Sequence, residues 1–106
     1  MRHTKSGDCY EMLCAAILYQ AALDYRDAMK RADRVRVKKL EDESERPRLI
    51  ARADAEIETL RRFFLGEWGD TLSHGMGEYI MSEVERLYRD GDQRWNKGSA
   101  RFADLF

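Results

Sequence analysis

The chain has few of the residues that interrupt helices or build reactive sites. Its 106 residues include one proline and two histidines, and its two cysteines are Cys9 and Cys14. Five positions apart in one expected helix, the two thiols point in different directions and are poorly placed to bridge, so we expect two free thiols. The imidazoles, His3 and His74, do not cluster with other ligands at the short spacing that a zinc site needs. We therefore predict no metal site and no cofactor.

A nucleophilic enzyme needs a cysteine or serine within reach of a histidine. A thiol of Cys9 or Cys14 working with His74 is the one such pairing that the sequence offers. A buried thiol on an amphipathic helix is the preferred interpretation, since free cysteine behaves as a small apolar residue. We predict no catalytic residues, and hence not an enzyme.

Long apolar runs are also missing. No stretch approaches the roughly 18 consecutive apolar residues of a membrane-spanning helix. The first eight residues are polar and lack the apolar centre of a signal peptide. We expect no membrane partner and a cytoplasmic location.

Charged residues are abundant instead, at 37% of the chain against about 25% in an average globular protein. Hydrophobic residues still make up 43%, which is enough apolar surface to exclude a wholly disordered chain. The length suits one core, so we predict a single helical domain over residues 1–106. Residues 1–53 carry 12 Lys and Arg against 9 Asp and Glu, whereas residues 54–106 carry 7 against 11. This asymmetry is too mild to indicate nucleic acid by itself.

A long first helix is predicted. Asp8, followed three residues later by Glu11, has the form of a capping box, and no glycine or proline follows until Pro47. We predict a flexible segment over residues 1–7 and a helix over 8–40. Its buried face is marked by apolar residues at steps of three and four: Cys14, Leu18, Ala21, Tyr25, Ala28, Ala32 and Val35. The stripe is widened at its start by Tyr10, Leu13 and Ile17.

A second helix is predicted over residues 45–65. The segment before it is almost wholly charged, and Pro47 suits the first turn of a helix. An apolar stripe repeats at steps of three and four, through Ile50, Ala53, Ile57, Leu60 and Phe64. The two helices are expected to form an antiparallel hairpin, with Phe64 buried against the first helix.

Glycines at positions 66, 69, 75 and 77 break the pattern after the second helix. They leave room for a short helix over residues 67–73, and Gly75 and Gly77 are interpreted as turn residues. A closing helix over 78–90 is expected to end at Gly91 in the left-handed conformation. Its predicted buried residues are Met76, Ile80, Val84 and Leu87. With no strand pattern, the fold class is all-α: a long antiparallel helical hairpin, then a short helix and a closing helix.

Two surfaces are candidates for binding. The first is a basic region at the tip of the hairpin that is suited to phosphates: Lys30, Arg31, Arg34, Arg36, Lys38, Lys39, Arg46 and Arg48. The alternative for these cations is favourable contact with a helix C-terminus and with nearby acidic residues. The second is aromatic, because aromatic residues are frequent anchors of protein interfaces. It lies in the tail over residues 92–106: Trp95, Phe102, Leu105 and Phe106. Trp68, Tyr79 and Tyr88 belong to the same aromatic group, and for Trp68 we prefer packing in the core around the short helix.

The segment from Leu60 to Trp68, with its double Phe, small, acidic and aromatic residues, resembles a loosely related group of small helical proteins of phages and integrative elements of Gram-positive bacteria. Leu72 and the later Glu78-Tyr79-Ile80 extend the resemblance, which covers about residues 10 to 90. It implies a bacterial host cell as the setting. It carries over no activity and no catalytic residues.

Three hypotheses follow for function. The first is a non-enzymatic phage or mobile-element protein that binds and modulates or inhibits a host protein or ribonucleoprotein complex, for example a defence nuclease, in the manner of an anti-CRISPR protein. The second is a small nucleic-acid-binding accessory or regulatory protein that uses the basic region. The third is a structural module that self-associates, for example as a homodimer, because such regular stripes pair across two-fold axes.

Overall fold

The computed structural model describes residues 2–91, with side chains from Tyr10 onward. Helix α1 spans Arg2–Val37, and a 3-10 helix, η1 (Glu43–Glu45), leads into α2 (Arg46–Leu65). Two shorter helices follow, α3 (Glu67–Leu72) and α4 (Gly77–Arg89). Residues 2–91 contain no strand. The predicted all-α fold, a long hairpin followed by a short helix and a closing helix, is confirmed.

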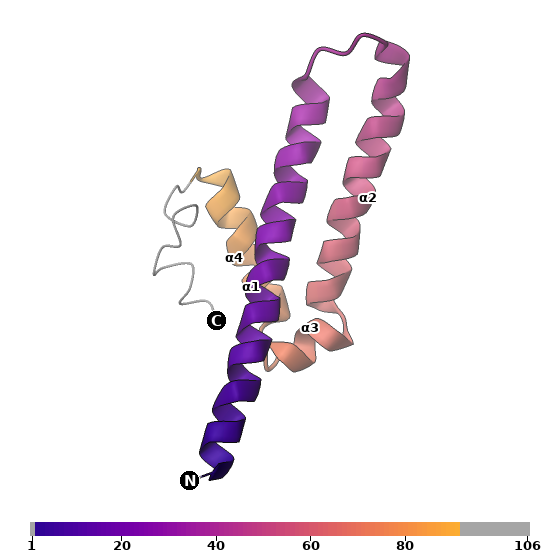
Figure 1. Cartoon of the computed structure of the whole chain (residues 1–106). Coiled ribbons are helices and arrows are strands. Elements are labelled where there is room, and N and C mark those ends of the chain that lie inside the picture. Colours follow the sequence, from indigo (N-terminus) through magenta and orange to yellow (C-terminus); the bar gives the residue numbers. More distant parts are fainter. Residues whose placement is uncertain (1, 92–106) are drawn as a thin grey trace.

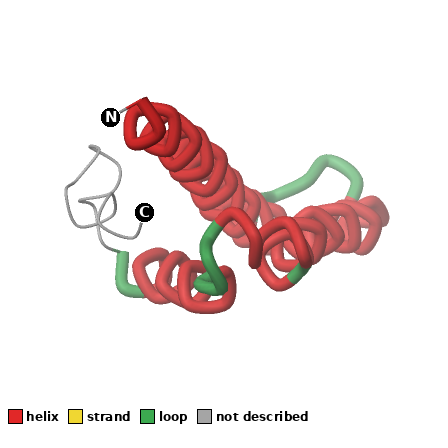
Figure 2. Tube along the Cα trace, turned by 90° about the horizontal axis from the view of Figure 1, so that it is seen from below, coloured by secondary structure: helices red, strands yellow, loops and turns green. Residues whose placement is uncertain are grey.

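Helix α1 is the central element, and the other α-helices pack against it (Figure 1). Helix α2 runs antiparallel to it, whereas α4 runs in the same direction as α1. This direction follows from two contacts, since Tyr25 meets Glu85 and, further along both helices, Asp33 meets Tyr88. Figure 2, seen from below, shows that α2 and α4 lie on different sides of α1. Helix α3 lies between the end of α2 and the start of α4.

The observed boundaries differ from the predicted ones mainly in α1. This helix begins at Arg2, so the predicted start at residue 8, with a capping box at Asp8, is wrong. The flexibility predicted for residues 1–7 stays a prediction, because their side chains lie outside the described part of the chain. Gly7 is the only residue there that opposes a helix, and one interior glycine costs only about 1 kcal/mol. Helix α1 also ends at Val37 rather than at residue 40. The other three α-helices lie within one residue of their predicted bounds.

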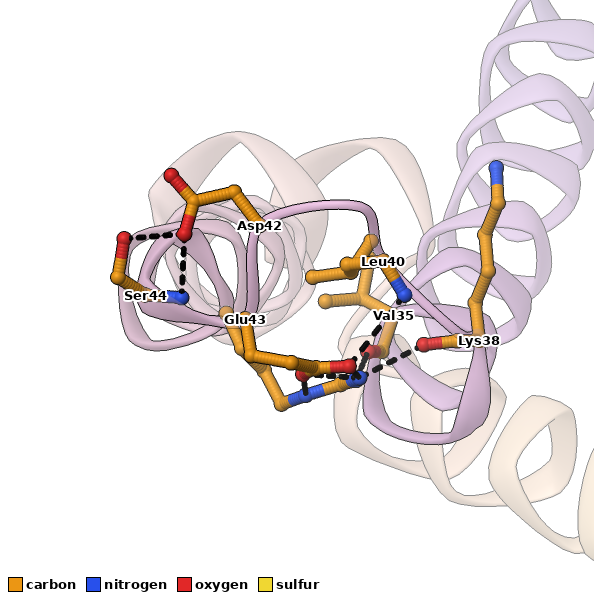
Figure 3. Close-up of polar contacts among 7 residues, drawn as sticks. Val35, Lys38, Leu40, Asp42, Glu43 and Ser44 are labelled. Carbon is orange, nitrogen blue, oxygen red and sulfur yellow. Dashed lines mark hydrogen bonds and ion pairs between the residues drawn. The ribbon is translucent and has the colours of Figure 1, made fainter.

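The tip of the hairpin is closed by Arg46, the first residue of α2. Its guanidinium donates to the carbonyl oxygens of Val35 at 2.5 Å and Lys38 at 2.8 Å, which are backbone acceptors left free where α1 ends. It also contacts the Glu43 carboxylate at 2.7 Å. Asp42 caps η1 by accepting a 3.0 Å hydrogen bond from the Ser44 backbone N–H (Figure 3).

The core follows the predicted stripes except at the start of α1, where Tyr10, Leu13 and Ile17, which were predicted to widen the buried stripe, are exposed. On α1 the buried side chains are Cys14, Leu18, Ala21, Ala22, Tyr25, Ala28 and Ala32, while Val35 is only half-buried. Helix α2 buries Ala53 and Phe64, and Phe64 is 1% exposed, as predicted. Helix α4 buries Ile80, Met81, Val84 and Leu87. The expected burial of Met76 is wrong, because this residue precedes α4 and is exposed.

Candidate protein-binding interface

Exposed large apolar side chains gather at one end of the molecule. Of the nine such side chains among the described residues, only Val37 lies at the hairpin tip. The other eight lie on the first half of α1 or around the α2–α3–α4 junction: Tyr10, Met12, Leu13, Ile17, Leu65, Trp68, Met76 and Tyr79. Concentrated apolar exposure of this kind is typical of an interaction surface, whereas single scattered residues are not.

The α2–α3–α4 junction is held together by two glycines that touch backbone. A Cβ atom at Gly69 would lie 2.2 Å from the Phe63 carbonyl oxygen and 2.7 Å from that of Phe64. A Cβ atom at Gly77 would lie 2.0 Å from the Phe64 carbonyl oxygen. Any larger residue would force the backbones apart, so α3 and the start of α4 are seated directly on the last turn of α2. We call this junction, residues 64–79, the glycine-packed corner.

The interpretation of Gly77 as a turn residue is therefore wrong, since it begins α4 and is buried. The interpretation of Gly75 is confirmed, because its φ of +85° is one that side chains rarely adopt. Its backbone N–H donates to the Asp70 carbonyl oxygen at 2.8 Å. The buried Ser73 hydroxyl donates to the Gly69 carbonyl oxygen at 2.5 Å and accepts from the Met76 N–H at 3.0 Å. Every backbone N–H from Ser73 to Met76, in the turn between α3 and α4, thus donates a hydrogen bond.

Trp68 projects from this corner with 72% of its surface exposed. Gly69 occupies the inward side of α3, together with Leu72 and Ser73 at steps of three and four. The indole therefore lies on a side of α3 that does not meet the core. A shallow depression of about 340 Å³ lies beside it, lined by Glu67, Trp68 and Thr71.

Tyr79, two residues after Gly77, is exposed as well. The prediction that Trp68 fills the core is wrong. The apolar space under α3 is taken up by Leu72 and by the close approach of the glycines. The glycine spacing was the available signal, because glycines inside short helices often mark close backbone contact rather than turns.

The basic region is largely neutralised by ion pairs. Half of its eight predicted residues contact a carboxylate: Arg31 with Glu56 at 2.8 Å, Arg36 with Asp54 at 3.0 Å, Arg46 with Glu43 at 2.7 Å and Arg48 with Glu45 at 2.5 Å. Within residues 10–91 no ion pair involves the other four, Lys30, Arg34, Lys38 and Lys39. The sequence pattern predicted that the eight cations lie near one end of the hairpin. It did not predict that Glu56 and Asp54 of α2 pair with Arg31 and Arg36.

A polar network ties α1, α2 and α4 together. The Tyr25 hydroxyl donates to the Glu85 carboxylate, and Arg61 donates to the same carboxylate oxygen at 2.8 Å. Burial and the hydrogen bond to Glu85 raise the pKa of Tyr25 to about 12. Tyr88 donates to the Asp33 carboxylate, and burial with this bond raises its pKa to about 12 as well.

A groove of about 690 Å³ lies over this network, with Met29 and Ile57 as its apolar lining. Its polar residues largely satisfy one another. Among the described residues, no buried side-chain nitrogen or oxygen lacks a hydrogen-bond partner. The groove therefore presents no buried group waiting for a ligand, and we favour the corner as the binding surface.

The reactive side chains stay apart. Cys14 is buried and free. It shares a cavity of about 80 Å³ with His74, but no hydrogen bond joins the two residues, and His74 instead contacts Glu11 at 3.2 Å. Residues 10–91 contain no group of three or more His, Cys, Asp or Glu side chains placed to hold a metal ion. None of the described helices has the length and apolarity that a membrane crossing requires.

Some predicted residues lie outside the part of the chain whose side chains the structure describes. These are the protein-binding residues predicted in the tail, Trp95, Phe102, Leu105 and Phe106, together with Cys9 and His3. Comparisons with protein-family models, with curated proteins and with solved structures find no match for the chain. Its function is therefore inferred from its own geometry.

Proposed function

We propose that this protein acts by binding another protein at the glycine-packed corner, with Trp68 as the central anchor. The observation that carries the proposal is a tryptophan that is 72% exposed although its neighbour Gly69 packs directly against the backbone of α2. Tryptophan is the residue type most enriched among binding hot spots. Its exposure leaves apolar area in water that a partner can cover.

Rigidity of the corner supports this role. Gly69 and Gly77 fix α3 and α4 against the carbonyl oxygens of α2, and Ser73 holds the connecting turn. A side chain presented on fixed backbone loses little conformational freedom when it binds, so more of the contact energy remains as affinity. Tyr79 and Leu65 on the neighbouring helices extend the apolar surface.

The partner proposed is a host protein or ribonucleoprotein complex in a bacterial cell, such as a defence nuclease, which the chain modulates or inhibits without catalysis. What supports this narrower proposal is the resemblance of the segment from Leu60 to Trp68 to small helical proteins of phages and integrative elements. The geometry of the corner supports the broader proposal, binding of a protein.

The test compares three forms of the protein as bait in a bacterial host lysate: wild type, Trp68→Ala and Val37→Ala. Val37 is 83% exposed at the opposite end, so its replacement controls for the loss of an exposed apolar side chain. We expect one complex to co-purify with wild type and Val37→Ala and to be lost with Trp68→Ala. Equal recovery by all three forms would rule out the corner as the interface.

The nucleic-acid alternative is favoured by a single observation. Within the described residues, Lys30, Arg34, Lys38 and Lys39 form no ion pair, and they lie on the last turns of α1 and in the segment that follows it. Four uncompensated cations suffice for weak, salt-dependent contact with phosphates. Because the other four predicted residues are ion-paired, we place this function second.

A further inference from the structure

Carboxylates flank the exposed aromatic side chains of the glycine-packed corner. Trp68 and Tyr79 are exposed, and so are three acidic residues close to them in sequence: Glu67, Asp70 and Glu78. Within residues 10–91 none of these three carboxylates takes part in an ion pair. No described cation therefore neutralises their charge.

The whole end of the molecule around the corner lacks cations. Residues 63–85 include five Asp and Glu but neither Lys nor Arg, and residues 10–25 of α1 include two Asp and Glu, again without Lys or Arg. The two stretches lie side by side, because His74 contacts Glu11 at 3.2 Å. The arginine that precedes the first stretch, Arg62, is itself ion-paired. Exposed apolar side chains and negative charge are therefore combined at this end.

Helix starts explain part of this charge bias. Glu67 and Asp70 lie in the first turn of α3, and Glu78 lies in the first turn of α4, where carboxylates stabilise a helix. Helix starts do not explain why Lys and Arg are missing from the whole stretch, nor why two aromatic side chains are exposed among the carboxylates. Because like charges repel, this combination discriminates against acidic surfaces, nucleic acids included, and favours basic ones.

We infer, on the basis of the proposed function, that the partner protein presents a basic surface to the corner, with arginine or lysine beside apolar side chains. Arginine suits the corner best, because a guanidinium stacks on an aromatic face and pairs with a carboxylate through its edge. The depression lined by Glu67, Trp68 and Thr71 offers both contacts in one place. The apolar side chains of the partner cover Leu65 and Tyr79, which extend the exposed surface.

The chain has one basic region of its own, the hairpin tip. Within the described residues, four of its cations form no ion pair: Lys30, Arg34, Lys38 and Lys39. Val37 is the one large apolar side chain that the described part of the tip exposes, so the tip of a second copy could cover little of Trp68. A different protein is therefore the occupant that fits the corner, and the mass of the protein in solution tells the two occupants apart.

The first experiment measures the binding of two short fluorescein-labelled peptides by fluorescence anisotropy. One peptide consists of Arg, Leu and Ala, and the other has Glu in place of every Arg. We expect the arginine peptide to bind at least about tenfold more tightly, and rising salt to weaken its binding. Equal affinities for the two peptides, or no binding of either, would overturn the inference.

Neutral variants locate the binding of the arginine peptide. Glu67→Gln, Asp70→Asn and Glu78→Gln together should weaken it about tenfold and reduce its salt dependence, because three exposed charge pairs are lost. The matched control for Glu67→Gln alone is Glu41→Gln, which removes an exposed carboxylate at the hairpin tip and should leave the affinity unchanged. Circular dichroism verifies that each variant keeps its helical content. An unchanged affinity of the triple variant would overturn the inference.

The second experiment separates the basic partner from the proposed function. The triple variant joins wild type and Trp68→Ala as bait in the host lysate, and we expect both variants to lose the complex that wild type captures. Loss with Trp68→Ala but full recovery by the triple variant would leave the corner as the interface and overturn the basic partner. Full recovery by both variants would overturn both.

Sedimentation equilibrium completes the test, and we expect wild type to keep the 12.5 kDa mass of one chain. A larger mass that the three substitutions return to one chain would assign the corner to the hairpin tip of a second copy. That result would also overturn the inference.

Discussion

The hydroxyl of Tyr25 in α1 donates a hydrogen bond to the carboxylate of Glu85 in α4, sixty positions away in sequence. Arg61 of α2 reaches the same carboxylate oxygen at 2.8 Å and the phenol oxygen at 3.3 Å. One carboxylate thus fixes the relative positions of three helices. Since the phenol must keep its proton to donate this bond, the contact makes the fold sensitive to alkaline pH.

Stability should fall between pH 10 and pH 12. Tyrosine ionises near pH 10 in an unfolded chain, and the fold raises the pKa of Tyr25 and of Tyr88 to about 12. The folded state therefore holds these protons more tightly, so the stabilisation is complete below pH 10 and is lost as the pH rises to 12. Melting temperatures measured from pH 8 to pH 12 check this. Tyr25→Phe with Tyr88→Phe should flatten the alkaline part of the curve, and an unchanged slope would contradict the pKa assignment.

Phe64→Ala should lower the free energy of unfolding by about 3 to 5 kcal/mol, a large part of the stability of a small domain. Phe64 is almost completely buried and contacts the ring of Tyr25 at a centroid distance of 6.0 Å. Urea unfolding measures the loss. The control is Leu65→Ala, because the neighbouring leucine is exposed and its removal should cost much less. Equal losses would mean that this face of α2 is not the core.

Gly69→Ala and Gly77→Ala should each destabilise the fold by about 3 kcal/mol, at the upper end of the usual cost of overpacking. The atoms that the new methyl groups meet are backbone carbonyl oxygens, which cannot rotate away. Gly91→Ala is the comparison, because within residues 2–91 no atom lies within 4 Å of its added Cβ and its φ of +68° is what opposes the change. That conformational cost is about 1 to 2 kcal/mol. Thermal unfolding that ranks Gly91→Ala as the most damaging of the three would refute the account of the corner.

Replacing Arg34, Lys38 and Lys39 together with Gln should leave the melting temperature almost unchanged, because exposed charges contribute little to stability. If the tip binds nucleic acid, affinity should fall and the slope of log affinity against log salt should flatten by about one for each lost phosphate contact. Fluorescence anisotropy with a labelled duplex at several salt concentrations measures the slope. An identical slope for the variant and wild type would remove the nucleic-acid alternative.

Deleting residues 99–106 tests the predicted aromatic tail. Phe102, Leu105 and Phe106 follow steps of three and four, and we predict that they dock on a partner or on a second copy. Docking on a partner predicts lost recovery with an unchanged melting temperature, and docking on a second copy predicts a smaller particle by light scattering. A lower melting temperature would instead indicate packing on the chain's own helices. If none of the three changes, the tail contributes no interface.

Periodicity was sufficient to predict the hairpin, because residues such as Leu18, Tyr25 and Phe64 recur over many turns and only one face of each long helix can bury them. It was insufficient for α3, which has six residues and too few turns to show which face packs. The pattern alone therefore places Trp68 in the core, although Gly69 takes the inward position in the structure. The pairing of Arg31 with Glu56 also escaped prediction, since it depends on the axial offset between α1 and α2, which no local pattern encodes.

The central position of α1 has a consequence for how the chain is made. This helix leaves the ribosome before the helices that cover it, and its last partners come from α4, because Tyr25 meets Glu85 only after sixty more residues have been added. At roughly 5 to 20 residues per second, its apolar stripe waits about 3 to 12 seconds for those partners. A product that stops short of α4 therefore keeps the α4-facing side of that stripe open to chaperones and proteases.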